Sequence, residues 1–409
     1  MDDLIIAIFL LTYVGMAVGR VPGLTLDRSG IALVAAVALL ASGTVGVGAA
    51  GAAIDMPTIL LLFALMLVSA QFQEAGLYRW VATRVASSQG GAVRLLFLTV
   101  LAAGLLSAVL ANDIVVFAMA PMLVDGIRGR GMDPRPYLLG LAGGANAGSA
   151  MTIIGNPQNI LVGQVGSLDF WSFLHVCGAP ALLSMLAVFV CVRLVWRRQL
   201  AGPALAAAAL PLPALDRWQT FKGVAAVLAL MALFATDMPR EVGALAVGGC
   251  LLLSRRLASR DMIGAVDWHL LLLFACLFVV TDSFAATAWA GGGVEWLAGQ
   301  HWLPDRVSVM APLLAVASNT VGNVPAVMLI LSLWPISAEG PLYGLALLST
   351  LAGNLLLVGS MANIIVAERA AACGVRLTFA DFARAGIPMT ALSLAVASLW
   401  LVLGQWMGW

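Results

Sequence analysis

Ten stretches of this chain are apolar for long enough to cross a lipid bilayer. A spanning helix needs about 20 apolar residues, because each residue adds about 1.5 Å and the hydrocarbon core is about 30 Å thick. Since 62% of the residues are apolar and only 10% are charged, the sequence predicts an all-α polytopic membrane protein. The candidate spans are residues 4–19, 30–50, 56–74, 137–164, 171–196, 218–236, 241–258, 268–289, 341–368 and 386–406.

Two further apolar stretches, residues 92–124 and 306–335, fit neither one crossing nor two. Their 33 and 30 residues would give about 50 and 45 Å of helix. Each has a polar cluster near its middle, Asn112-Asp113 in the first and Ser318-Asn319-Thr320 in the second. We expect two re-entrant hairpins that reach mid-membrane and return, since non-helical backbone is tolerated there only against protein or a cavity.

The distribution of positive charge supports this layout, because cytoplasmic loops collect Lys and Arg. With both stretches re-entrant and both termini outside, 19 of the 21 basic residues are cytoplasmic, and only Arg240 and Arg306 are outside. Arg28 is among the cytoplasmic ones, and no Lys, Arg or His is expected at mid-membrane. The first apolar run follows an acidic start, so we expect a retained span rather than a signal peptide.

The two halves of the chain show the same order of features. Residues 1–196 and 218–409 each hold five spans and one hairpin, and the Ala/Pro-rich residues 197–217 between them are predicted to be a cytoplasmic linker. Asn112 matches Asn319 at an offset of 207 residues, and Asn159 of GNPQNILV matches Asn363 of GSMANIIV at an offset of 204. Because five is odd, the second half must be inverted. Such repeats are typical of secondary transporters, whose sites lie near the midplane.

The two 28-residue spans, 137–164 and 341–368, require either strong tilt or a helix break, and the first favours a break. Unbroken, each would be about 42 Å long. In the first, Pro157 cannot donate a backbone hydrogen bond and Gly155 loosens the helix. The second, Gly359-Ser360-Met361-Ala362-Asn363, lacks the proline. The small-residue run 143–149 is predicted to serve close helix packing, with Asn146 as a further candidate for a site.

Acidic residues at depth are functional candidates, because burying a charge in the membrane is costly. Asp113 stands at a predicted hairpin tip, where it would hold Na⁺ or carry a proton. Asp282 is a second candidate that could instead cap a helix irregularity. Carbonyls and carboxylates at such tips suit a small cation, and helix N-termini suit an anion.

Several classes of function are excluded by missing motifs. The sequence has no phosphate-binding GxxxxGK[ST] loop and no CxxC or HExxH spacing. We therefore expect no enzyme, no cofactor and no metal beyond Na⁺. A formal net charge of +1 argues against a nucleic acid partner.

The hairpin tips and helix breaks resemble those of the ion transporter superfamily, which includes dicarboxylate/sodium symporters, citrate permeases, arsenite permeases and some sodium/proton antiporters. The resemblance covers nearly the whole chain, and its Asp113 and Asn323-Val324-Pro325 are more like the arsenite- and citrate-transporter branches than the dicarboxylate one. It implies eight substrate-binding residues: Asn112, Asn156, Asn159, Ser318, Asn319, Thr320, Ser360 and Asn363. It implies coupling-ion residues Asn112, Asp113, Ser318, Asn319 and Asn323.

The predicted function is a secondary permease for a small anion, such as a di- or tricarboxylate, an inorganic oxyanion or arsenite. A Na⁺ or H⁺ gradient would drive it by alternating access. A Na⁺/H⁺ antiporter is the alternative, and a channel could use the same hairpins. The predicted location is a bacterial inner membrane, and since members of the resembled superfamily are often dimers, a homodimer is implied.

Overall fold

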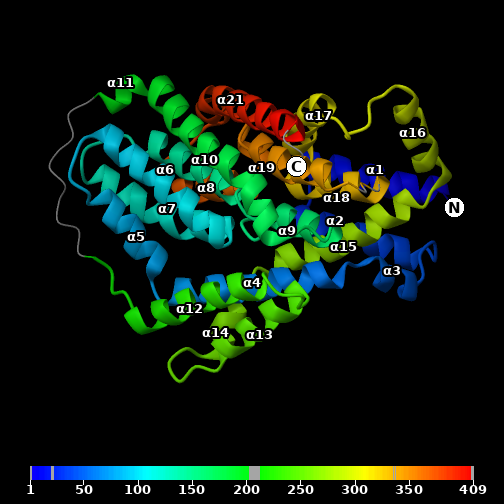
Figure 1. Cartoon of the computed structure of the whole chain (residues 1–409), viewed down its shortest axis with the longest axis horizontal. Helices are drawn as coiled ribbons and strands as arrows, with labels where there is room; N and C mark the ends of the chain where they lie inside the picture. Colours follow the sequence, from blue (N-terminus) through cyan, green and yellow to red (C-terminus); the bar gives the residue numbers. More distant parts are fainter. Residues whose placement is uncertain (1, 20–22, 202–211, 335, 337, 407–409) are drawn as a thin grey trace.

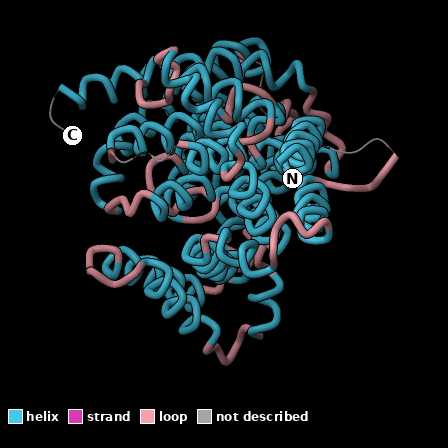
Figure 2. Tube along the Cα trace, turned by 90° about the vertical axis from the view of Figure 1, so that its right-hand side faces the viewer, coloured by secondary structure: helices cyan, strands magenta, loops and turns pink. Residues whose placement is uncertain are grey.

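The computed structural model describes residues 2–19, 23–201, 212–334, 336 and 338–406, and these form helices and loops with no strand (Figures 1 and 2). The all-α prediction is therefore confirmed. Residue Arg20, most of the predicted linker (202–211), residue 335 of the second hairpin and the last three residues lie outside the described ranges.

The first half of the chain contains helices α1 to α11. Their bounds are α1 Asp2–Val18, α2 Arg28–Ala41, α3 Val47–Ala53, α4 Met56–Glu74, α5 Leu77–Ala86, α6 Ala92–Val109, α7 Asn112–Arg128, α8 Arg135–Ser149, α9 Pro157–Val165, α10 Phe170–Val195 and α11 Arg197–Leu200.

The second half contains helices α12 to α21 and one 3-10 turn. Their bounds are α12 Arg217–Leu233, α13 Arg240–Leu252, α14 Ser259–Gly264, α15 Trp268–Ala285, α16 Ala288–Gly299, α17 Val307–Thr320, α18 Asn323–Leu333, α19 Glu339–Ala352, η1 Leu357–Gly359, α20 Met361–Ala372 and α21 Phe379–Trp406.

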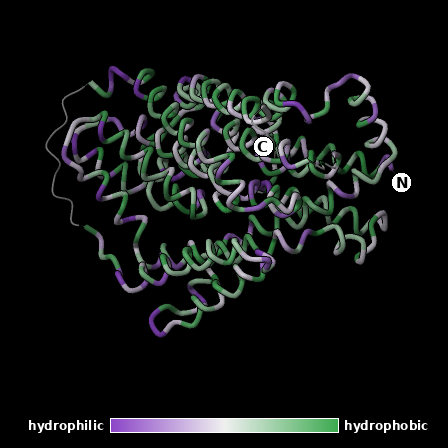
Figure 3. Tube along the Cα trace, in the orientation of Figure 1, coloured by the Kyte–Doolittle hydropathy of each residue, from purple (hydrophilic) through white to green (hydrophobic). Residues whose placement is uncertain are grey.

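Among the described helices, α4, α6, α10, α15 and α21 are long and apolar enough to cross a membrane. Hydrophobic residues dominate the helices, and many hydrophilic ones lie in peripheral loops (Figure 3). The chain is thus an integral multi-pass membrane protein.

Several predicted spans differ in detail from the structure. The run 30–50 is divided, because α2 ends at Ala41 and α3 begins only at Val47. At 14 residues, α2 is about 21 Å long, too short for a full crossing. The predicted span 241–258 is helical only to Leu252. The predicted span 268–289 contains α15, which ends at Ala285, and the first two residues of a separate helix, α16. Apolar composition alone did not reveal these helix ends.

Both predicted hairpins and both predicted breaks coincide with interruptions of helix. The first hairpin is α6 and α7 with a turn at residues 110–111, and the second is α17 and α18 with a turn at 321–322. The loop 150–156 separates α8 from α9. The loop and 3-10 turn over 353–360 separate α19 from α20.

The helices pack in recognisable groups. Helices α4, α12, α13 and α14 contact one another along the lower edge of Figure 1, and α1, α2 and α15 pack together. A third group joins α6, α8, α10, α19 and α21. The first hairpin lies to the left of the middle of Figure 1 and the second to the right of it, so the two lie on opposite sides of the centre of the molecule.

Arginine side chains join several loops at one end of the molecule. Arg128 donates to the carbonyls of Cys373 (2.5 Å) and Gly374 (2.8 Å). Arg130 donates to three carbonyls in the loop after α5, and Arg135 lies over the ring of Trp196. The loops after α5, α7, α10 and α20 thus share one end, as the charge distribution predicts.

Candidate functional site

Each hairpin tip contacts the helix break of its own half of the chain. In the first half, the backbone N–H of Asn112 donates to Gly155 O (3.4 Å). In the second, Asn319 Nδ2 donates to Ala352 O (2.8 Å) and its Oδ1 accepts from Leu356 N (3.0 Å). The tips and breaks therefore form one polar centre within the apolar bundle.

The glycines at the breaks allow the chain to fold tightly on itself. A Cβ on Gly155 would lie 2.2 Å from Ser149 O, and one on Gly359 would lie 2.7 Å from Gly353 O. Gly322, in the second hairpin turn, has a φ of 101°, which only glycine adopts readily. The second break forms even though it lacks the proline that favours a break in the first, because side chains hold its backbone.

Two asparagines hold the broken backbone in both halves. Asn159 Nδ2 donates to Ser149 O (3.2 Å) and Thr152 O (3.0 Å). Asn363 Nδ2 donates to Gly353 O (2.8 Å) and Leu356 O (3.1 Å). Each pair of equivalent positions differs by 204 residues. These amides satisfy carbonyls that the helix breaks leave without partners.

The two broken helices cross and bond through side chains. Asn146 Nδ2 donates to Asn363 Oδ1 (2.9 Å), and its Oδ1 accepts from Ser360 Oγ (3.0 Å). In the matching arrangement, Thr350 Oγ1 donates to Asn159 Oδ1 (3.1 Å) and accepts from Asn156 Nδ2 (3.2 Å). Asn146 and Thr350 also differ by 204 residues. Asn146 is thus central to the network, while Gly144 and Gly148 of its run pack closely on α6, as predicted.

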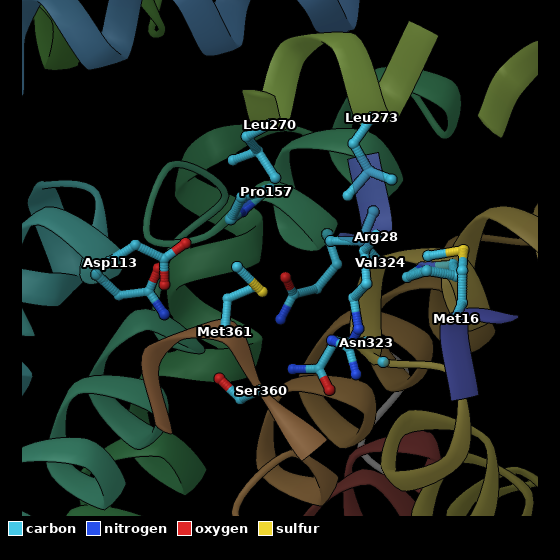
Figure 4. A pocket seen from close by; sticks show the side chains of 14 residues that line it. Met16, Arg28, Asp113, Pro157, Leu270, Leu273, Asn323, Val324, Ser360 and Met361 are labelled. Atoms are coloured by element: carbon cyan, nitrogen blue, oxygen red, sulfur yellow. The ribbon is translucent and has the colours of Figure 1, made fainter. Parts of the chain in front are cut away.

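A small pocket lies where the tips and breaks meet (Figure 4). Its cavity volume is about 40 Å³, room for about three water molecules. Most of its lining comes from the first turns of six helices, α2, α7, α9, α15, α18 and α20. The lining residues are Met16, Arg28, Asn112, Asp113, Pro157, Gln158, Leu270, Leu273, Gly322, Asn323, Val324, Pro325, Ser360 and Met361.

These helix starts turn partial positive charge toward the pocket, although the Asp27 and Asp267 carboxylates cap two of them, α2 and α15. Each helix N-terminus presents free N–H groups and about half a positive charge. Because six such ends face one small space, the arrangement suits an anion. Asp113, in the first turn of α7, is the acidic side chain on the pocket wall.

Asp113 also lines a second, adjoining cavity together with Asp267 and Asn156. Asp267 caps the start of α15, where its carboxylate accepts from Leu270 N (3.0 Å). Two carboxylates from different halves of the chain thus border the same space. Asp282, the other acidic candidate, is exposed in the last turn of α15 and does not line the pocket.

The expectation that no positive side chain stands beside the tips is wrong for Arg28. The sequence places Arg28 in a cytoplasmic loop, but its Nη1 lies 3.4 Å from the position of a Cβ on Gly322. Arg28 is the first residue of the short helix α2. Apolar length predicted the end of α1 and the start of α2 to within about two residues, so it is the packing of the short helix α2 in the bundle, which sequence does not reveal, that brings this arginine to the hairpin tip.

Four buried oxygens near the tips have no hydrogen-bond partner in the described part of the chain: Ser107 Oγ, Asn112 Oδ1, Ser318 Oγ and Asn323 Oδ1. Asn112 begins α7 and Asn323 begins α18, at an offset of 211 residues, and Ser107 and Ser318 share that offset. By position in the hairpin, Asn112 therefore corresponds to Asn323 and not to Asn319. Sequence analysis missed Ser107, although it stands five residues before Asn112 as Ser318 stands before Asn323.

The predicted site residues thus divide by location. Asn112, Asp113, Asn323 and Ser360 line the pocket, and Asn156 lines the adjoining cavity. Asn159, Asn319 and Asn363 are bonded to backbone at the breaks. Thr320 is exposed and donates to Val316 O of its own helix. Sequence analysis did not select Arg28 and Gln158, which also line the pocket.

Comparison with known proteins gives the family. The profile described as "Citrate transporter" matches residues 8–340, well over half of the chain. The chain belongs to the citrate transporter family. The resemblance to the ion transporter superfamily is therefore confirmed, and the protein is a secondary transporter and not an enzyme.

Relatives of this citrate transporter family member match over nearly their whole length. The "46 kDa membrane protein" of Mycobacterium leprae is 28% identical over 98% of both chains. The "Silicon efflux transporter LSI3" of Oryza sativa subsp. japonica is 26% identical over 92% of both. The solved structure of the YdaH transporter of Alcanivorax borkumensis has a TM-score of 0.57 and 17% identity, covering 100% of this chain and 98% of that one. That likeness shows the fold alone.

Proposed function

We propose that this family member is a permease for a small anion, driven by a Na⁺ or H⁺ gradient. The observation that carries the proposal is the convergence of six helix N-termini on one pocket. Free backbone N–H groups and aligned helix dipoles favour negative charge at such a point. The cavity of about 40 Å³ has room for about three water molecules, so a di- or tricarboxylate would require the pocket to widen.

The proposed architecture is two inverted repeats, residues 1–196 and 218–409, joined by the cytoplasmic linker 197–217. Each repeat would contribute five spans and one re-entrant hairpin. The matched hydrogen bonds at an offset of 204 residues support this arrangement. The hairpins on opposite sides of the centre of the molecule also support it (Figure 1). The end that gathers Arg128, Arg130 and Arg135 would face the cytoplasm of a bacterium, with both termini outside.

The proposed coupling-ion site uses the unpartnered oxygens at the tips. Asn112, Asn323 and Ser318 each place a buried oxygen without a donor near the tips, and Asp113 adds a carboxylate. Such oxygens suit Na⁺, and the carboxylate suits a proton. The Asn319 amide would support this site indirectly, because its oxygen and nitrogen already bond to the second break.

Transport by alternating access would move the hairpins and crossed helices against α1–α4 and α12–α15. The substrate-binding residues we propose are Asn112, Asn156, Ser360 and Asn323, with Asn159, Asn319 and Asn363 holding the backbone around them. A homodimer is proposed only because members of the superfamily are often dimers.

The test is transport by purified protein in liposomes. We expect uptake of at least one of citrate, sulfate, phosphate or arsenite under an imposed Na⁺ or H⁺ gradient, with saturation at high substrate concentration. Absence of flux for every one of these under both gradients would refute the anion permease. Single-channel currents without saturation would instead indicate a channel.

A Na⁺/H⁺ antiporter is the second candidate, favoured by the cavity that Asp113 and Asp267 share. Sodium-dependent proton movement without any anion would support it. Asp113→Asn should then abolish exchange, whereas an anion permease whose cation is bound by the neighbouring amides would retain part of its flux.

A further inference from the structure

We infer that Arg28 makes the central pocket selective for ionised ligands, by binding a carboxylate or oxyanion through its guanidinium. This inference rests on the proposed function, in which the pocket holds the substrate. In this inference Arg28 binds the ligand together with the helix N-termini, and the ligand is in its ionised form.

The guanidinium of Arg28 faces the pocket without a protein partner. Across the described residues, no hydrogen bond or ion pair involves this side chain. The neighbouring Asp27 carboxylate caps α2 by accepting from Gly30 N (2.8 Å). The surrounding walls are largely apolar, with Met16, Leu270 and Leu273 beside it (Figure 4).

Arg28 stands where a positive charge is electrostatically unfavourable. It occupies the first position of α2, and cations destabilise helix N-termini. The starts of α18 and α20 face the same pocket. Although Asp27 caps the same helix, no ion pair in the described part of the chain involves Arg28, so a half-buried cation at these helix starts is poorly placed for stability alone. A bound anion would relieve both the arginine and the helix ends.

Asn323 supplies a second recognition group next to Arg28. Its side chain is 8% exposed, packs against Gly353 and makes no hydrogen bond in the described part of the chain. Figure 4 shows Asn323 close to Arg28, with Asp113 on the far side of the pocket. A planar guanidinium and an adjacent amide can donate several parallel bonds to the oxygens of one anion. Because Asp113 stands on the opposite wall (Figure 4), the anion is placed on the side of the pocket that Arg28 and Asn323 form.

The experiment compares ligand binding by the purified full-length protein and three variants. Arg28→Gln removes the charge but keeps N–H donors, and Arg28→Lys keeps the charge without the planar fork. Arg306→Gln is the matched control, because Arg306 also stands at a helix start but is exposed and outside the pocket. The probes are citrate and phosphate, which are ionised at neutral pH, and silicic acid, which is not.

We expect Arg28→Gln to weaken binding of the ionised ligand about 10- to 100-fold, the range for losing a charge-assisted hydrogen bond. Binding of an uncharged ligand should be unchanged, Arg28→Lys should lose less than Arg28→Gln, and Arg306→Gln should match wild type. A general structural defect would weaken charged and uncharged ligands alike.

Two results would overturn the inference about Arg28 and leave the proposed function standing. One is wild-type anion affinity in Arg28→Gln, and the other is equal loss in Arg28→Lys and Arg28→Gln, which would assign the effect to shape. If the wild-type protein binds none of the anions and transports none, the proposed function itself is refuted. The two failures are therefore distinguishable.

Discussion

Replacing Asn146 by alanine should destabilise the crossing of the two broken helices. Asn146 is 1% exposed, and its amide donates to Asn354 Oδ1 (2.8 Å) and Asn363 Oδ1 (2.9 Å) while accepting from Ser360 Oγ (3.0 Å). Its Oδ1 also accepts from Asn112 Nδ2 (3.4 Å). Four such bonds at about 0.6 kcal/mol each amount to about 2 kcal/mol. The cost rises toward about 4 kcal/mol because two buried acceptors are left without a donor.

The assay is thermal unfolding of the detergent-purified variants, followed by tryptophan fluorescence. Asn146→Asp keeps the side-chain shape but replaces the two donors with an oxygen, so it should lower the melting temperature at least as much as Asn146→Ala. Thr12→Val is the control, because the Thr12 hydroxyl bonds only to Ile8 O of its own helix. The double variant of Asn146→Ala with Asn363→Ala should lose less than the two single losses together, since they share a bond.

If Asn146→Ala and Asn146→Asp both have the same melting temperature as Thr12→Val, the hydrogen-bond network contributes nothing to stability and our account of the helix crossing is incorrect. A strictly additive double variant would show that Asn146 and Asn363 do not interact.

Two further predictions concern a helix break and an outer loop. Gly359→Ala should reduce transport strongly, because the new Cβ would lie 2.2 Å from Asn319 Oδ1 and displace the amide that holds the second break. Gly299→Ala is the control, since the space around Gly299 is open and its flux should be unchanged. Equal flux in the two variants would contradict the argument. In the loop before α10, burial alone would raise the pKa of Asp169, but hydrogen bonds from the Ser172 and Trp171 backbones and the nearby Arg240 hold that pKa below its usual value. A carboxyl group whose pKa is lower in the folded than in the unfolded protein stabilises the fold at pH values above its unfolded-state pKa. This stabilisation is lost as the pH falls through the folded-state pKa. Asp169→Asn should therefore flatten the decline of the melting temperature with falling pH near pH 4, and an unchanged pH profile would count against the argument.

The local features of this protein were predictable from short stretches of sequence. Apolar length gives the long helices such as α10 and α15, and glycine, proline and asparagine chemistry gives the interruptions near residues 112, 157, 321 and 360. These signals are local, because a helix ends where its own residues stop favouring it. The division of residues 30–50 into two helices was missed, since apolar composition continues across the turn.

The amino-acid sequence by itself determined that this chain would be an all-helical membrane transporter with paired hairpin tips and helix breaks. Only the tertiary structure decided which polar residues face the pocket and which hold the backbone. Asn159 and Asn363 sit in the most recognisable motifs yet bond to carbonyls, whereas Arg28, assigned to a loop, reaches the hairpin tip. The carbonyls that Asn159 and Asn363 bind are only 7 to 10 residues away. The physical reason is that the contact of Arg28 with Gly322 joins positions almost 300 residues apart, and helix packing, which no local pattern encodes, sets which side chains remain free to face the pocket.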